Sequence, residues 1–178
     1  MKVVVLMDNG FEELEAMGSI ALLRRGNVDV DLVSVTGNSV TGRFGVTYSP
    51  TFAMKDYDFS QADCLMLPGG PHYQKIEANP EVLALIKEFA EHKVMAAICA
   101  GPTVLGHLGL LKGKNYTCFK SMDEDFGGTY QEAYAVVDGN IVTGKSAAAS
   151  IDFAFALMEK LCGKAHTDEV KASIYYQE

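Results

Sequence analysis

The apolar run Val94–Ile98, which ends abruptly at Cys99, restricts the fold of this chain more than any other feature. A continuous apolar run of this length is typical of a strand buried on both faces of a sheet. Small residues, a proline and a helical pattern follow at once, over residues 101–108. The pattern therefore predicts a buried strand that delivers Cys99 to a sharp turn at the start of a helix.

The rest of the chain alternates between strand-like and helical patterns. Strands are expected at 2–7, 28–35, 63–67 and 94–98, and helices at 11–25, 80–92, 101–108, 149–162 and 166–176. A short β excursion is expected at 39–54 and a hairpin at 133–143, with its turn at Asp138–Gly139. The alternation predicts one α/β domain over residues 1–178, with a doubly wound, mostly parallel sheet covered by helices. The strand ends at Asp8–Gly10, Pro68–Gly70 and Cys99 should then meet at one edge.

Cys99 carries the clearest chemical signal. Unpaired backbone N–H groups and the dipole at the start of a helix favour negative charge, which lowers the pKa of a cysteine thiol. This makes a reactive thiolate the leading interpretation. A buried structural cysteine is the alternative, because free cysteine is among the most buried residue types.

Glu15 is the second candidate. At about 100° per residue, Glu15 falls with Phe11 and Leu14 on the apolar side of helix 11–25, whereas Glu13 and Arg24 fall on the solvent side. Burial disfavours the ionised carboxylate, so we expect Glu15 to keep its proton, to stabilise a thiolate at Cys99, and to serve as a general acid or base. The alternative is a first-turn glutamate that only favours the helix dipole.

The tripeptide Pro68–Gly70 follows directly after a predicted strand. Gly69 and Gly70 allow a sharp turn and bring backbone N–H groups close to a ligand. The amides of Gly70 and Ala100 are therefore expected to form an oxyanion hole for an intermediate at Cys99. Taken alone, such a tripeptide is a weak signal, since most are merely turns.

The segment Gly139–Ser146 matches the phosphate-binding pattern GxxxxGK[ST]. That motif needs its variable residues in a loop, whereas Ile141–Thr143 are predicted to form a strand of the hairpin. We therefore reject a nucleotide triphosphatase. Lys145 and Cys118 are still expected at the rim of the active site, and His72, which follows the glycine pair, is expected there near Cys99.

Length and composition exclude several classes of protein. The chain has 178 residues and a formal net charge of −8, which argues against a nucleic-acid binder. Its first apolar run is too short for a signal peptide, and no run approaches the roughly 18 apolar residues of a membrane span. The four cysteines form no CxxC pair, so neither a zinc site nor a disulfide framework is suggested. We expect a cytoplasmic protein with no metal ion and no cofactor.

Three motifs together carry a family resemblance. The segments Phe11–Glu15, Leu67–Gly70 and Ala96–Pro102 resemble those of the ThiJ/PfpI superfamily, and the similarity extends to Ser150–Ala154 and Tyr175–Tyr176. The branch that looks most similar contains the parkinsonism-associated protein deglycase and its bacterial relatives. The resemblance implies a flavodoxin-like fold, a homodimer, a nucleophilic cysteine, and a hydrogen-bonded glutamate beside it.

This resemblance assigns the nucleophile to Cys99, its partner to Glu15, and the oxyanion pocket to Gly70 and Ala100. Two departures bear on activity. The intracellular-protease branch has a histidine directly after the cysteine, where this chain has Ala100, which counts against a peptidase. Some deglycase relatives carry a histidine where this chain has Cys118, which weakens the case for efficient proton transfer. The basic residue that follows the hairpin in some relatives is matched by Lys145.

Three functions are compatible with these residues. The leading one is an enzyme that acts on small reactive carbonyl compounds such as methylglyoxal, by addition of the Cys99 thiolate and proton transfer by Glu15. The alternative is an oxidative-stress sensor with an oxidisable cysteine and no turnover. An amidase or peptidase ranks third. Surplus apolar residues in the β excursion, among them Phe44 and Val46, favour a homodimer as well.

Overall fold

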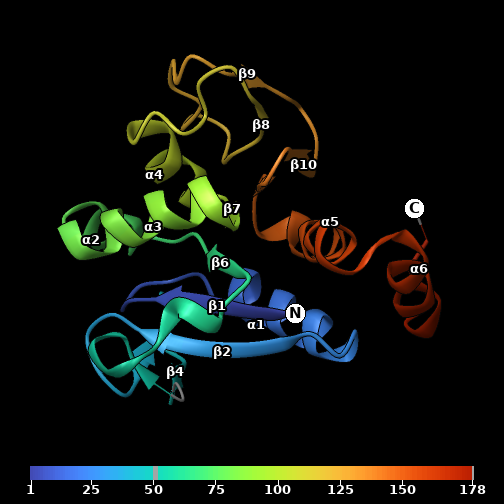
Figure 1. Cartoon of the computed structure of the whole chain (residues 1–178), viewed down its shortest axis with the longest axis horizontal. Helices are drawn as coiled ribbons and strands as arrows, with labels where there is room; N and C mark the ends of the chain where they lie inside the picture. The colour runs from blue at the N-terminus through green and yellow to red at the C-terminus, as the bar shows by residue number, and fades with distance from the viewer. Residues whose placement is uncertain (50–51, 178) are drawn as a thin grey trace.

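The computed structural model describes residues 1–49 and 52–177, so residues 50 and 51 of the predicted β excursion lie outside the described part. A seven-stranded sheet occupies its centre, in the order β10-β11-β7-β6-β1-β2-β5 (Figure 1). The strands are β1 (Lys2–Met7), β2 (Asp29–Ser34), β5 (Phe52–Ala53), β6 (Cys64–Leu67), β7 (Val94–Ile98), β10 (Ala135–Asp138) and β11 (Ile141–Gly144). All neighbours are parallel except β10 and β11, which confirms the predicted, mostly parallel α/β sheet.

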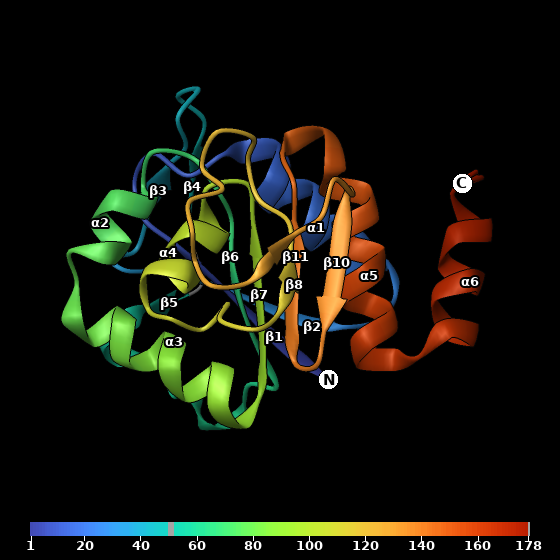
Figure 2. The same cartoon turned by 90° about the horizontal axis from the view of Figure 1, so that it is seen from above.

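Helices cover both faces of this sheet (Figures 1 and 2). They are α1 (Glu13–Arg25), α2 (Tyr73–Glu77), α3 (Pro80–His92), α4 (Gly101–His107), α5 (Ser150–Cys162) and α6 (Lys164–Ser173), with short 3-10 turns at Met54–Asp56, Phe59–Gln61 and Ala147–Ala149. Because side chains alternate along a strand, Val3 and Val5 pack in the core under α1 and α5, while Val4 and Leu6 pack in the core under α3 and α4. Nearly continuous apolar strands are the consequence of burial on both faces.

Small details differ from the sequence-based expectations. The hairpin pairs Asp138 with Ile141, so Gly139 and Asn140 form the turn in place of Asp138–Gly139. Gly139 takes the positive φ of +62° that this turn requires. The two-residue pair β3–β4 lies within the β excursion expected at 39–54, whereas helix α2 and the two-residue pair β8–β9 were not predicted. These pairs comprise β3 (Val40–Thr41), β4 (Thr47–Tyr48), β8 (Asn115–Tyr116) and β9 (Thr129–Tyr130).

The predicted orientation of α1 is wrong in part. Leu14 is 57% exposed, whereas Glu13 is buried. Glu13 Oε1 accepts a hydrogen bond of 2.8 Å from the amide of Phe44 in the β3–β4 loop, and this contact, which periodicity alone does not reveal, keeps Glu13 out of solvent. Glu15 is fully buried, as predicted.

The order of the strands places the functional edge. After β1 the chain adds β2 on one side, and then β6 and β7 on the other, so the direction of winding reverses between β1 and β6. Ligands of open α/β sheets bind beyond the carboxyl ends of the strands at such a reversal. The segments that follow β1, β6 and β7 lie there, and they contain Asp8–Gly10, Pro68–Gly70 and Cys99.

Candidate active site

Cys99 occupies a strained turn between β7 and α4. Its φ is +63°, in the left-handed region that residues other than glycine rarely adopt. Two backbone hydrogen bonds of 2.9 Å hold the turn, from the Cys99 amide to the Gly144 carbonyl and from the Phe119 amide to the Cys99 carbonyl. The turn is therefore fixed from both sides by neighbouring segments, and it presents the half-buried thiol at the carboxyl edge of the sheet.

Glu15 reaches the same place from the first turn of α1. Its amide donates to Glu12 Oε2 at 2.8 Å, so Glu12 caps the helix. Its Oε2 accepts a hydrogen bond of 2.7 Å from the Gly69 amide. Its Oε1 is buried and has no hydrogen-bond partner among the described residues. The carboxyl group as a whole lies within hydrogen-bonding reach of the Cys99 thiol. One buried carboxyl oxygen is thus left for the thiol or for a ligand.

Gly69 explains how closely these groups approach. A Cβ atom built on Gly69 would lie 2.5 Å from Glu15 Oε2 and 2.6 Å from Cys99 Cβ, distances that real Cβ atoms do not show. Gly69 therefore lies between the two side chains, and any larger residue would push them apart. Gly70 has a φ of +95°, and a Cβ there would lie 2.6 Å from the carbonyl oxygen of Gly10.

The two acidic groups titrate as a pair. Burial raises the pKa of Glu15 to about 7, while the hydrogen bond with Cys99 acts in the opposite direction. Burial and the negative charge of Glu15 raise the pKa of the Cys99 thiol, which the Ala100 amide only partly offsets. The expectation that the helix start lowers the pKa of Cys99 is therefore wrong for a thiol that faces an ionised Glu15. The pair loses its first proton near pH 7 and holds the second one tightly.

A mostly apolar pocket of about 280 Å³ opens above the thiol. Its described lining residues are Arg43, Gly70, Pro71, Tyr73, Gln74, Cys99, Ala100, Phe119 and Met122. The Ala100 amide contacts the Cys99 thiol, and the Gly70 amide has no hydrogen-bond acceptor within residues 1–49 and 52–177. Both expected oxyanion donors, Gly70 and Ala100, thus line the same pocket as the thiol.

Three residues expected at the rim lie elsewhere. His72 is buried and accepts from the Asp8 amide at 3.1 Å, while its other ring nitrogen lies 2.8 Å from the Pro68 carbonyl. Burial lowers the pKa of His72 to about 4, so its ring is neutral at pH 7. It connects the segments that follow β1 and β6. Cys118 is also buried, with its thiol directed at its neighbour's carbonyl, and Lys145 pairs with Glu132.

Arg43, a charged residue of the pocket lining, was not predicted from the sequence. No local pattern marks it, because it belongs to a loop of the β excursion, and only the fold brings this loop beside Cys99. Phe119 and Met122 were missed for the same reason. Each comes from a segment without helical or strand periodicity.

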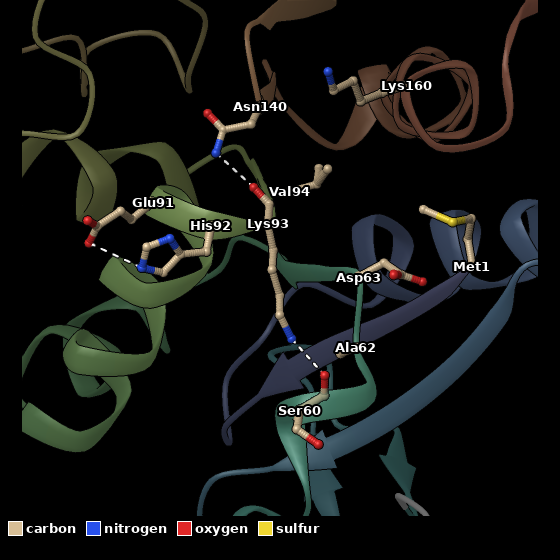
Figure 3. A pocket seen from close by; sticks show the side chains of 10 residues that line it. All are labelled: Met1, Ser60, Ala62, Asp63, Glu91, His92, Lys93, Val94, Asn140 and Lys160. Atoms are coloured by element: carbon tan, nitrogen blue, oxygen red, sulfur yellow. Dashed lines mark hydrogen bonds and ion pairs between the residues drawn. The ribbon is translucent and has the colours of Figure 1, made fainter.

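A second hollow of about 480 Å³ lies at the opposite edge, near the amino ends of the strands (Figure 3). Several of its polar groups are hydrogen-bonded to the protein itself. Asn140 Nδ2 donates to the carbonyls of Ala90 and Lys93 at 2.6 and 2.7 Å, and Lys93 Nζ donates to the Ser60 carbonyl at 3.0 Å. These bonds tie loops together, which indicates a structural role for this hollow.

The sequence and the fold are both similar to those of known proteins. A model of the DJ-1/PfpI family matches residues 1–160. A deglycase of Thermococcus kodakarensis is 32% identical over 82% of this chain and 90% of its own length, and a Parkinson disease protein 7 homolog of Danio rerio is 29% identical over 97% and 96%. Among solved structures, a cysteine-to-alanine mutant of a DJ-1 superfamily protein from Salmonella typhimurium has a TM-score of 0.92 at 33% identity, covering 99% of both chains.

Two features are absent from residues 1–49 and 52–177. None of the helices there has the length and apolar character needed to cross a lipid bilayer. The same residues contain no cluster of three or more metal-binding side chains.

Proposed function

This chain belongs to the DJ-1/PfpI family, and we propose that it is a cysteine-dependent enzyme that acts on small reactive carbonyl compounds. The observation that carries the proposal is the buried pair itself. A carboxyl group with one oxygen free of backbone partners faces a thiol on a strained turn. Strain and unsatisfied buried polar atoms are costly, and they concentrate where a protein performs chemistry.

The first step is addition of Cys99 to the carbonyl carbon. The sulfur–carbon bond forms, the π electrons of the carbonyl move to oxygen, and the thiol proton passes to Glu15. A carboxyl group with a pKa of about 7 suits this task, because it is half ionised at neutral pH and still basic enough to accept a proton. The amides of Gly70 and Ala100 face the developing oxyanion.

For a 2-oxoaldehyde, the remaining steps need only proton transfer and water. Glu15 returns its proton to the oxyanion, which gives a hemithioacetal. It then takes the proton of the former aldehyde carbon and returns it to the neighbouring carbon, while the hydroxyl proton moves from the first oxygen to the second, which gives a thioester. Water hydrolyses the thioester, which releases a 2-hydroxy acid and the free thiol. The relatives named deglycase support this reaction class, at 29 to 32% identity.

The test is formation of lactate from methylglyoxal by the purified protein. We expect activity in the wild type and in Cys162→Ser, a matched control at the end of α5, and its loss in Cys99→Ser. Equal lactate formation by the wild type and Cys99→Ser would remove Cys99 from the reaction and refute the proposal.

A redox sensor is the second candidate, and the exposure of the cysteines favours it. Cys99 lines a pocket, whereas Cys64 and Cys118 are fully buried. An accessible thiol is oxidised first, and Glu15 Oε1, which lacks a hydrogen-bond partner among the described residues, is available to bind the resulting sulfinic acid. A Toxoplasma gondii DJ-1 solved in an oxidised state has a TM-score of 0.90 at 28% identity. Mild peroxide followed by peptide mass analysis tests this function. Two added oxygens confined to Cys99, in a protein without carbonyl turnover, are its signature.

A peptidase is the least favoured activity. A Bacillus subtilis relative that is 33% identical is named a putative cysteine protease. However, none of the four histidines, all within the described residues, lines the pocket above Cys99. An imidazole base, which cysteine peptidases use, is therefore missing from this pocket.

A homodimer in the cytoplasm completes the proposal. Phe44 and Val46, on the β3–β4 loop that projects from the sheet edge in Figure 2, are 70% and 49% exposed. Leu14 on α1 and Ile151 on α5 are exposed apolar residues as well. Apolar surface of this kind is typical of an interface. Light scattering at micromolar concentration should give twice the chain mass, and a monomer there would contradict the dimer.

A further inference from the structure

Arg43 is a charged group of the pocket that the proposed reaction leaves unused. The other described lining residues are neutral at the start of the reaction or carry the reacting thiol. Within the described part of the chain, Arg43 forms no ion pair, and its guanidinium carbon lies 5.0 Å from the centre of the Phe44 ring. A guanidinium without a carboxylate partner at the mouth of a mostly apolar pocket is available to an anionic ligand.

The loop that carries Arg43 is held in place. The Arg43 amide donates to the Phe11 carbonyl at 2.8 Å, and the Phe44 amide donates to Glu13 Oε1 at 2.8 Å. A Cβ on Gly42 would lie 2.2 Å from Glu13 Cδ, so the loop packs directly on this carboxyl group. Glu13 is 9% exposed, and its Oε2 has no hydrogen-bond partner among the described residues. Burial of an acidic side chain is costly, and here the buried Glu13 fixes the position of the loop that carries Arg43.

The charge of Arg43 also reaches the reacting pair. Burial raises the pKa of Glu15, and the positive charge of Arg43 is among the influences that oppose this shift. An anionic substrate group next to Arg43 would therefore lie beside the thiol. The pocket volume of about 280 Å³ restricts the ligand to a few heavy atoms beyond the carbonyl.

We infer that the preferred substrates are small carbonyl compounds that carry a carboxylate, with Arg43 binding the carboxylate while Cys99 attacks the carbonyl carbon. Arginine suits this role because its planar fork binds a carboxylate through two parallel hydrogen bonds. The inference rests on the proposed function and narrows its substrate class. Glyoxylate is the simplest compound of this class, and glyoxal is its uncharged counterpart.

Two alkylating agents separate the inference from the proposed function. Iodoacetate and iodoacetamide react in the same way: the sulfur–carbon bond forms, the carbon–iodine bond breaks, iodide leaves and the thiol proton goes to Glu15. They differ in charge. The rate at Cys99 is followed by peptide mass analysis for each agent, and the ratio of the two rates is normalised to that of free glutathione. Any effect of a variant on the thiol itself cancels in this ratio.

The variants are Arg43→Gln, Arg43→Lys and the control Arg25→Gln. Arg25 is exposed and lies ten residues beyond Glu15 on α1, about 15 Å along the helix axis. We expect Arg43→Gln to lower the iodoacetate-to-iodoacetamide ratio about threefold to tenfold at low salt, and Arg43→Lys to keep most of it. Arg25→Gln, which removes the same net charge, should leave the ratio unchanged.

The outcomes are distinguishable. An unchanged ratio in Arg43→Gln, with Cys99 reactive, overturns the inference and leaves the proposed function standing. Failure of both agents at Cys99 in the wild type overturns the proposed function. Protection gives a second readout: glyoxylate should slow the reaction with iodoacetamide at lower concentration than glyoxal does, and this difference should vanish in Arg43→Gln. Equal protection by both compounds in the wild type contradicts the inference.

Discussion

The two edges of the central sheet use their polar groups in opposite ways. At the amino edge, Lys93 and Asn140 are bonded to backbone carbonyls of neighbouring loops (Figure 3). At the carboxyl edge, Glu13 and Glu15 each keep a buried oxygen without such a partner, and Cys99 has a strained backbone. Pocket volume does not mark the chemistry, since the hollow at the amino edge is larger than the pocket above Cys99.

The amino edge therefore contributes to stability, whereas the carboxyl edge contributes to reactivity. Polar groups that satisfy one another hold loops together and leave nothing for a ligand. Groups that are buried but unsatisfied reduce stability, and they are retained where they act on a substrate. Substitutions at the amino edge should therefore cost stability, and those at the carboxyl edge should cost activity.

The largest effect is expected for Glu15→Gln. The amide keeps the shape of the side chain but cannot accept a proton, so turnover of methylglyoxal should fall by about 10²- to 10⁴-fold.

The same substitution should also change how the free energy of unfolding depends on pH. Because the pKa of Glu15 is raised to about 7, the wild type should lose up to about 3 kcal/mol as the pH rises from about 4.5 to 7. The variant should lack this loss. Denaturant unfolding at several pH values and the lactate assay together measure both effects. Equal turnover in both proteins would contradict the role of Glu15 in the reaction.

Asn140→Ala tests the amino edge. Removing two hydrogen bonds to the carbonyls of Ala90 and Lys93 should lower the free energy of unfolding by about 1 to 3 kcal/mol, with turnover retained. Urea unfolding gives the first quantity and the lactate assay the second. A variant with wild-type stability and impaired turnover would reverse the assignment of the two edges.

The strain at Cys99 can be measured directly. Glycine adopts a φ of +63° without strain, whereas alanine does not. Cys99→Gly should therefore be more stable than Cys99→Ala by about 1 kcal/mol, although glycine also gains freedom in the unfolded chain. Thermal unfolding of the two inactive variants provides the comparison. A less stable glycine variant would mean that the turn stores no strain.

The smallest effect concerns His107, which lies between Glu77 of α2 and Glu124, at 2.6 and 3.1 Å. Partial burial lowers the pKa of His107, but these two hydrogen bonds outweigh it, and the pKa is raised. The stabilisation is therefore complete below the unfolded pKa of about 6.5, and it is lost as the pH rises through the higher folded value. Because the ring is partly exposed, we expect less than about 1 kcal/mol. His107→Gln should flatten this part of the pH profile of stability. An unchanged profile would show that the contacts of His107 with Glu77 and Glu124 do not stabilise the fold.

Local patterns were sufficient for most of the strands and helices and for the ends of β1, β6 and β7. The apolar runs predicted β1, β6 and β7, and therefore the edge at which Cys99 and Pro68–Gly70 meet. Helical periodicity also predicted that Glu15 is buried. These features depend on residues close together in the sequence, or on a general rule for open sheets.

Long-range contacts explain the failures. His72 follows the glycine pair, yet it turns inward to bond the Asp8 amide and the Pro68 carbonyl. Glu13 is buried because a distant loop donates to it, and Arg43 reaches the pocket on that loop. The pKa of Cys99 is raised, not lowered, because the thiol is buried and faces a negative charge on Glu15, which was expected to keep its proton.

The central claim is that Cys99 and Glu15 share one proton, and the pH dependence of Cys99 alkylation by iodoacetamide tests it most directly. In the wild type, the rate should rise with a midpoint near pH 7, where the pair loses its first proton. In Glu15→Gln, the thiol must ionise alone in a buried place, so the midpoint should move above the ordinary thiol value of about 8.5. The same midpoint in both proteins would contradict the shared proton and with it the assignment of Glu15.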